Sequence, residues 1–120
     1  MSFRDLPTVS LRIDGHMTPL RVYEASRFLP RARGLLGGER LRELEALWIR
    51  PCGSVHTIGM RYAIDVVFLD RQERVVCVKR QVEPLRFARH RRAHSTIELL
   101  AGTAAALAVA EGSKLEKVLS

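Results

Sequence analysis

The strongest constraint on the fold is a pair of β-branched runs separated by a short polar turn. Residues 63–70 read AIDVVFLD and residues 74–82 read RVVCVKRQV. Valine and isoleucine favour strands because their branched side chains pack well on a pleated surface. The polar residues 70–73 between the runs are typical of a turn. We therefore predict two strands here, the clearest in the chain.

The rest of the chain predicts more short strands and little helix. Residues 8–22 alternate apolar and polar side chains, and Asp14-Gly15 can supply the positive φ angles of a tight hairpin turn. The alanine-rich residues 102–112 predict a short helix, with Thr103 as its N-cap and Gly112 at its end. The remaining predicted segments are strands at 45–50, 95–100 and 114–118, a basic loop at 84–94, and a short helical turn opened by Pro30 within 25–38.

Together these segments predict a mainly β (α+β) fold with six or seven short strands and two or three short helices. The regular alternation of strand and helix that marks a parallel sheet is absent. This favours a small antiparallel β-sandwich or barrel. A length of 120 residues suits one domain that buries its own core, so residues 1–120 are expected to form a single domain.

The cysteines and the N-terminal sequence favour the cytoplasm. Cys52 and Cys77 are too few for a disulfide framework, and their unpatterned spacing suggests free thiols in a reducing compartment. The first ten residues lack the basic and apolar regions of a signal peptide. No apolar run approaches the roughly 18 residues that a membrane span requires. We expect a cytoplasmic protein with no membrane association.

One loop gathers reactive side chains: residues 51–60 read PCGSVHTIGM. Cys52, His56 and Met60 recur at intervals of four, and together they are soft ligands suited to Cu(I). The flanking glycines and proline disfavour the helix that would align them, and no second ligand cluster completes a site. We therefore expect no bound metal and no cofactor. The simplest interpretation is that Cys52 and Met60 fill the core, while Ser54 and Thr57 cap turns.

Two carboxylates interrupt otherwise apolar strand faces. Asp65 lies within residues 63–70 and Glu98 within residues 95–100, and burying an unpaired charge is costly. Each carboxylate either pairs with an arginine or lies at a strand end in water, or else both line one polar pocket. A Cys52–His56 nucleophilic pair would need a third group such as these carboxylates to orient the imidazole. The candidate cleft therefore comprises Cys52, Ser54, His56, Thr57, Met60, Asp65 and Glu98.

The charge of the chain raises the question of nucleic acid. The net charge is +7, and Arg86, Arg89, Arg91 and Arg92 lie within seven residues with no acidic residue among them. Such a patch predicts weak, nonspecific, salt-sensitive binding to duplex nucleic acid, because phosphate contacts release counterions. Aromatic residues make up 6% of the chain, which is thin for base stacking.

Three stretches together resemble a known family. They are RARGLLGG at 31–38, LWIRPCGSVHTIGMRYAIDVVFLD with the following RVVCVKRQVEP at 47–84, and IELLAG near AEGSKL at 97–115. In combination they resemble the bacterial family called domain of unknown function 192 (DUF192), over roughly residues 24–118. The positions that fit its motif are Gly34, Leu35, Met60, Asp65, Phe68, Asp70, Pro84, Glu98, Gly102 and Gly112.

The loop and the C-terminal motif carry the finer detail of this resemblance. The Pro-Cys-x-Ser-Val-His-Thr loop is similar to one bacterial subgroup, whereas other members lack the cysteine and histidine. The family's Gly-Asp step is here Gly112-Ser113. The resemblance implies a compact, mainly β domain with no established biochemical activity. It also argues against Cys52 and His56 as a catalytic centre shared by the family.

These observations favour a small binding or accessory module with a polar cleft, for an unknown small ligand or protein. Two alternatives remain open. One is a small enzyme that uses Cys52 and His56, or Asp65 and Glu98, although the sequence favours a protein without catalytic activity. The other is a basic accessory protein that touches nucleic acid through Arg86–Arg92.

Overall fold

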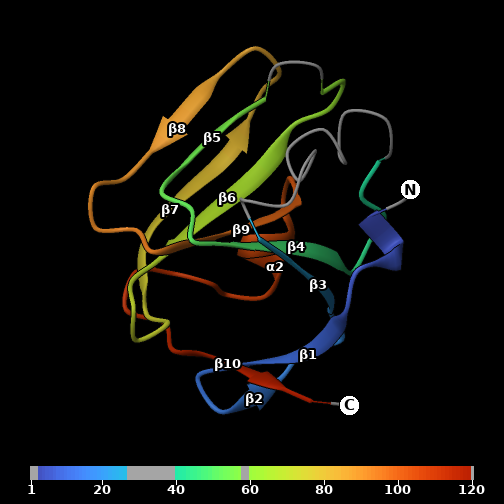
Figure 1. The fold of residues 1–120 in the computed structure, drawn as a ribbon, viewed down its shortest axis with the longest axis vertical. Helices are drawn as coiled ribbons and strands as arrows, with labels where there is room; N and C mark the ends of the chain where they lie inside the picture. The colour runs from blue at the N-terminus through green and yellow to red at the C-terminus, as the bar shows by residue number, and fades with distance from the viewer. Residues whose placement is uncertain (1–2, 27–39, 58–59, 120) are drawn as a thin grey trace.

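The computed structural model describes residues 3–26, 40–57 and 60–119. These residues form one eight-stranded sheet, a separate two-stranded sheet and little helix (Figure 1). The elements in chain order are η1 (Phe3–Asp5), β1 (Thr8–Ile13), β2 (His16–Met17), β3 (Arg21–Ser26), β4 (Glu45–Arg50), β5 (Ser54–His56), β6 (Ile64–Leu69), β7 (Val75–Val82), β8 (Phe87–Arg89), β9 (Ser95–Leu100), α2 (Thr103–Ala106) and β10 (Leu115–Val118).

The large sheet follows the order β10-β1-β3-β4-β9-β6-β7, and β2 pairs with β1. Every pairing in it is antiparallel except that of β3 with β4, which is parallel. The sheet curls until its two edges meet at one end, where the Val75 N–H donates to the Ser113 carbonyl at 2.9 Å and the Leu115 N–H to the Glu73 carbonyl at 3.0 Å. The fold is therefore a curled half-barrel, and the expected mainly β architecture is confirmed.

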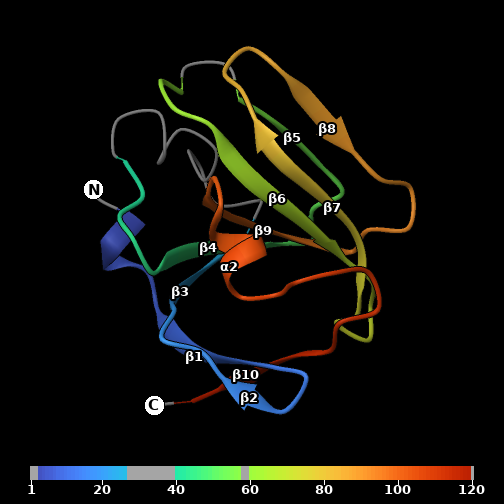
Figure 2. The same ribbon diagram turned by 180° about the vertical axis from the view of Figure 1, so that it is seen from behind.

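Each face of the sheet packs a core of its own. The inner face of the curl holds Trp48 and the aliphatic side chains of six further strands, and α2 covers it with Ala104. The outer face is covered by the two-stranded sheet of β5 and β8 and by η1, which contribute Val55, Ala88 and Phe3. Figure 2 shows from behind how β5 and β8 lie beside β6 and β7, at the opposite end of the molecule from β10. Because both faces are covered, strands such as β6 are apolar on both sides.

The helical predictions are the least accurate. The described residues contain one 3₁₀ turn and one short α-helix in place of two or three helices. Thr103 is the first residue of α2 and not its N-cap; that position belongs to Gly102, whose φ of 94° suits a glycine. The helix ends early because Ala108 adopts a positive φ of 56° and turns Val109 into the inner core. Pro30 and its predicted turn lie outside the described residues.

The segment predicted as a basic loop at 84–94 also differs, because it contains strand β8. The reactive loop is likewise partly a strand: β5 pairs with β8, with Val55 opposite Ala88 and His56 opposite Phe87. Among the residues described, none of the helices has the length and apolar character required to cross a membrane.

Candidate functional site

Asp65 has a structural environment that the sequence did not reveal. It is 1% exposed and accepts three backbone hydrogen bonds, and none of the described arginines pairs with it. Oδ1 accepts from the Gln81 N–H at 2.9 Å, and Oδ2 accepts from the Gly102 and Ala104 N–H groups at 3.0 and 2.9 Å. These bonds fix an irregularity in β7, where the pairing shifts between Ile64 and Val66, and tie the start of α2 to the sheet.

Glu98 lies on the other face of the sheet. Asp65 is opposite Leu99 in the register of β6 and β9, and Leu99 belongs to the inner core. Glu98 is opposite Val66, which belongs to the outer core. The sheet therefore separates the two carboxylates, and they do not share a pocket. Burial raises the pKa of Tyr62, and the negative charge of Glu98 raises it further, which places these two side chains near each other.

A third buried carboxylate, Glu45, escaped the sequence analysis. Arg4 binds it with two nitrogens, Nε to Oε2 at 2.9 Å and Nη2 to Oε1 at 2.7 Å. The Tyr23 hydroxyl and the Arg42 N–H donate to the same carboxylate at 3.1 and 2.7 Å. Burial raises the pKa of Glu45, but these donors and the charge of Arg4 outweigh it and hold the pKa below 4.5. This network links η1 to β3 and β4, so its role is structural.

The reactive loop does not assemble a catalytic pair. Cys52 is 4% exposed and packs in the outer core, where its Sγ donates to the Ser54 carbonyl at 3.1 Å. Met60 lies in the same core, whereas His56 is exposed on β5. Among the residues that the structure describes, no three His, Cys, Asp or Glu side chains gather as a metal site would require. The interpretation that Cys52 and Met60 fill the core agrees with this placement.

Thr57 proves to be the residue that joins the loop to the basic segment. It is fully buried, and its hydroxyl donates to the Glu83 carbonyl at 2.6 Å. The same oxygen accepts from the Arg86 N–H at 2.8 Å, and the Thr57 N–H donates to the Arg86 carbonyl at 2.9 Å. The backbone of Arg86 is therefore held in place before any ligand arrives, although its side chain is exposed.

A shallow groove of about 500 Å³ runs between β7 and β8. Its lining residues are Lys79, Gln81, Val82, Glu83, Arg86, Phe87, Ala88 and Arg89. Strand alternation explains the arrangement, since Ala88 packs in the outer core and its neighbours Phe87 and Arg89 are exposed. Phe87 is 63% exposed, and it lies between Arg86 and Ala88 in the sequence, two residues before Arg89.

The groove carries uncompensated positive charge. Lys79, Arg86 and Arg89 are exposed and form no ion pair with any described carboxylate, whereas Arg4 and Arg50 pair with glutamates. Glu83 contributes the one acidic side chain among the described lining residues. The predicted patch is thus divided: Arg86 and Arg89 line the groove, and Arg91 and Arg92 are exposed in the turn beyond β8. The sequence did not predict that Lys79 and Phe87 line the same groove, because they lie 8 residues apart on two different strands.

One protein-family model matches most of the length of the chain. The model of the DUF192 family, described as "Uncharacterized ACR, COG1430", matches residues 9–117. The chain belongs to DUF192. Two motif positions of the DUF192 resemblance meet in the structure, since Asp65 accepts a hydrogen bond from Gly102. These positions therefore hold the fold together and do not present a reactive group.

Two solved structures are similar to this DUF192 domain in fold. A protein of unknown function from Novosphingobium aromaticivorans has 20% sequence identity and a TM-score of 0.77, with 92% of this chain and 86% of that one covered. A candidate transcription regulator from Sinorhizobium meliloti has 18% identity and a TM-score of 0.81, with 98% and 96% covered. At this identity the likeness establishes the fold alone. The comparison with curated proteins found no match.

Proposed function

We propose that this DUF192 domain is a cytoplasmic accessory module that binds nucleic acid in the groove between β7 and β8. The observation that carries the proposal is a groove lined by the exposed ring of Phe87 and by three exposed cations, Lys79, Arg86 and Arg89, which form no ion pair within the described part of the chain. A net charge of +7 favours approach to any polyanion. The description of the S. meliloti structure as a candidate transcription regulator is in keeping with this role. The cytoplasmic location rests on two cysteines that are free thiols, Cys52 and Cys77.

The groove favours a single strand over a duplex. A single strand exposes its bases, and an aromatic ring beside cations can stack on a base while the cations bind the phosphates on either side. Phe87 has this position between Arg86 and Arg89. Each phosphate contact contributes a slope of about −0.7 to the logarithm of the affinity against the logarithm of salt, so three contacts predict a slope near −2. A duplex would satisfy the cations but offer no base face to Phe87.

Fluorescence anisotropy with a labelled oligothymidine tests the proposal. Arg86→Ala and Arg89→Ala should each weaken binding and each reduce the salt slope by about 0.7. Arg71→Ala is the matched control. Arg71 is exposed in the turn between β6 and β7, and its replacement removes the same charge from a different surface. If the double variant of Arg86 and Arg89 binds as tightly as Arg71→Ala, the groove is not the binding site.

Phe87→Ala separates the two kinds of nucleic acid. Loss of a stacked base costs about 1–3 kcal/mol, so affinity for oligothymidine should fall roughly 5- to 150-fold. The affinity of Phe87→Ala for a duplex of equal length should stay within twofold of the parent value, because the groove would contact only the phosphates of a duplex. Equal losses for both ligands would refute base stacking and leave a general polyanion surface. Phe87 is exposed, so its removal does not disturb the core.

A further inference from the structure

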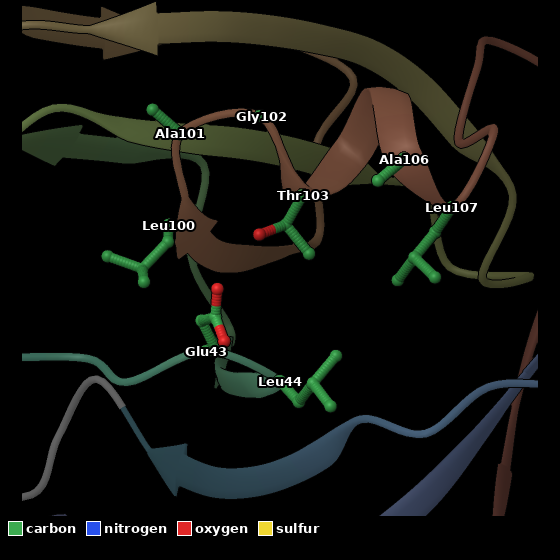
Figure 3. Close-up of a pocket in the computed structure, with 8 residues that line it drawn as sticks. All are labelled: Glu43, Leu44, Leu100, Ala101, Gly102, Thr103, Ala106 and Leu107. Carbon is green, nitrogen blue, oxygen red and sulfur yellow. The ribbon is translucent and has the colours of Figure 1, made fainter.

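A second pocket lies on a different part of the molecule, between the loop before β4 and the segment that leads into α2 (Figure 3). It has a volume of about 460 Å³, within the usual range for small-molecule sites. Its lining residues are Glu43, Leu44, Leu100, Ala101, Gly102, Thr103, Ala106 and Leu107. The basic groove shares none of these residues, so the two sites are separate.

The lining combines an apolar wall with one negative charge. Leu44 and Leu107 point into the space from opposite sides, and the carboxylate of Glu43 points toward the side that holds Leu100 and Thr103 (Figure 3). Of the described residues that line the pocket, Glu43 alone is charged. The net charge of the chain is +7, so a pocket whose described lining carries a single negative charge differs from the chain as a whole. It suits a cation with an aliphatic body.

Leu44 provides the second observation. Its φ is +63°, a left-handed conformation that is uncommon for leucine, and the side chain is nevertheless 46% exposed. This φ belongs to a turn in which the Glu45 N–H donates to the Arg42 carbonyl at 3.2 Å, and the turn holds a large apolar side chain over the pocket instead of in the core. Backbone strain of this kind is found at ligand sites as well as in turns. The strain is maintained by the neighbours, because the Leu44 carbonyl accepts from the Arg21 N–H at 2.8 Å.

The opposite wall is equally well fixed. Asp65 accepts hydrogen bonds from the N–H groups of Gly102 and Ala104, which lie on either side of Thr103. Ala104 is fully buried in the inner core. The two walls are therefore rigid and preformed, which reduces the entropy lost when a ligand binds.

We propose that this pocket binds a small primary alkylammonium ion. The ammonium group would meet the Glu43 carboxylate and donate to the Thr103 hydroxyl, and the alkyl chain would lie on Leu44, Leu100 and Leu107. Ammonium is a compact cation with three donors, which suits one carboxylate and one hydroxyl. Small-molecule sites are usually lined by apolar side chains, with a few polar groups that fix the orientation of the ligand.

Methyl and amide NMR spectra recorded during a titration with n-pentylamine test this assignment. Saturable shifts should appear at Leu44, Leu100 and Leu107, and n-pentanol, which lacks the charge, should bind at least tenfold more weakly. Glu43→Gln should weaken pentylamine binding about tenfold, whereas Glu116→Gln, which neutralises an exposed glutamate on β10, should not.

A second variant guards against loss of the fold. Asparagine tolerates left-handed backbone, so Leu44→Asn should keep the loop and abolish the shifts at Leu100 and Leu107. The assignment is overturned if pentanol binds as well as pentylamine, if Glu43→Gln binds as the parent does, or if the shifts lie outside the pocket. Unchanged spectra for the parent protein at saturating pentylamine would also overturn it.

Discussion

Replacement of Asp65 by asparagine should destabilise the protein markedly, although the two side chains have the same shape. Asp65 uses both carboxylate oxygens, one for Gln81 and the other for Gly102 and Ala104. An amide has one oxygen and one donor group. Of the two orientations that the amide can adopt, the better one keeps its oxygen as acceptor for the N–H groups of Gly102 and Ala104. The NH₂ group then faces the N–H of Gln81, and two donors meet.

The magnitude follows from these contacts. One hydrogen bond to a charged acceptor is lost, worth about 1.5–3 kcal/mol, and the two that remain become neutral and weaken by about 0.5–1 kcal/mol each. Gln81 is exposed, so water can partly replace its lost partner. We expect the free energy of unfolding to fall by about 2–4 kcal/mol, a large share of the about 5–15 kcal/mol typical of a domain.

Urea unfolding followed by the fluorescence of Trp48, which is fully buried, measures this loss. Asp70→Asn is the matched control. Asp70 accepts from the N–H groups of Gln72 and Arg74 with Oδ1 alone, at 2.8 and 3.0 Å. Asparagine can keep both bonds, so the change should stay within about 0.5 kcal/mol. If Asp65→Asn were as mild as Asp70→Asn, the structural role assigned to Asp65 would be wrong.

Three further predictions concern other candidate residues. The lowered pKa of Glu45 stabilises the fold above pH 4.5, and this contribution is lost as pH falls through the folded value; the stability difference between the parent and Glu45→Gln should therefore shrink in acid urea melts. Glu98→Gln removes a negative charge near Tyr62, so an ultraviolet titration should show the pKa of Tyr62 lowered toward 10.0; no change would contradict their proximity. His56→Ala should alter stability by less than about 0.5 kcal/mol, whereas buried Cys52→Ser should cost about 1 kcal/mol; the reverse order in urea melts would contradict their placement.

Local pattern predicted the strands well. The predicted strands at 63–70 and 74–82 contain β6 and β7, and the hairpin turn at Asp14-Gly15 has the expected positive φ angles of 49° and 82°. Alternation and turn chemistry act over a few residues, so they can be recognised in one sequence. The parallel pairing of β3 with β4 was not predicted, because it is decided by the closure of the whole sheet.

The candidate site depended more on distant contacts. A carboxylate on an apolar strand face identified Asp65 and Glu98 as unusual positions. The sequence did not predict that the two side chains lie on opposite faces of the sheet, or that Asp65 binds backbone N–H groups. Spacing in the reactive loop suggested chemistry for His56, whereas pairing with β8 exposes it. The arginines of the basic patch were visible in the sequence, and the alternation of Phe87 with buried Ala88 was the signal that could have revealed the exposed ring.

The most direct test of the proposed function is a map of backbone amide shifts on titration with oligothymidine. The largest changes should cluster at Lys79 and Arg86–Arg89, on the two sides of the groove between β7 and β8, and they should weaken as salt rises. Changes centred on another surface, or no saturable change at low salt, would contradict it.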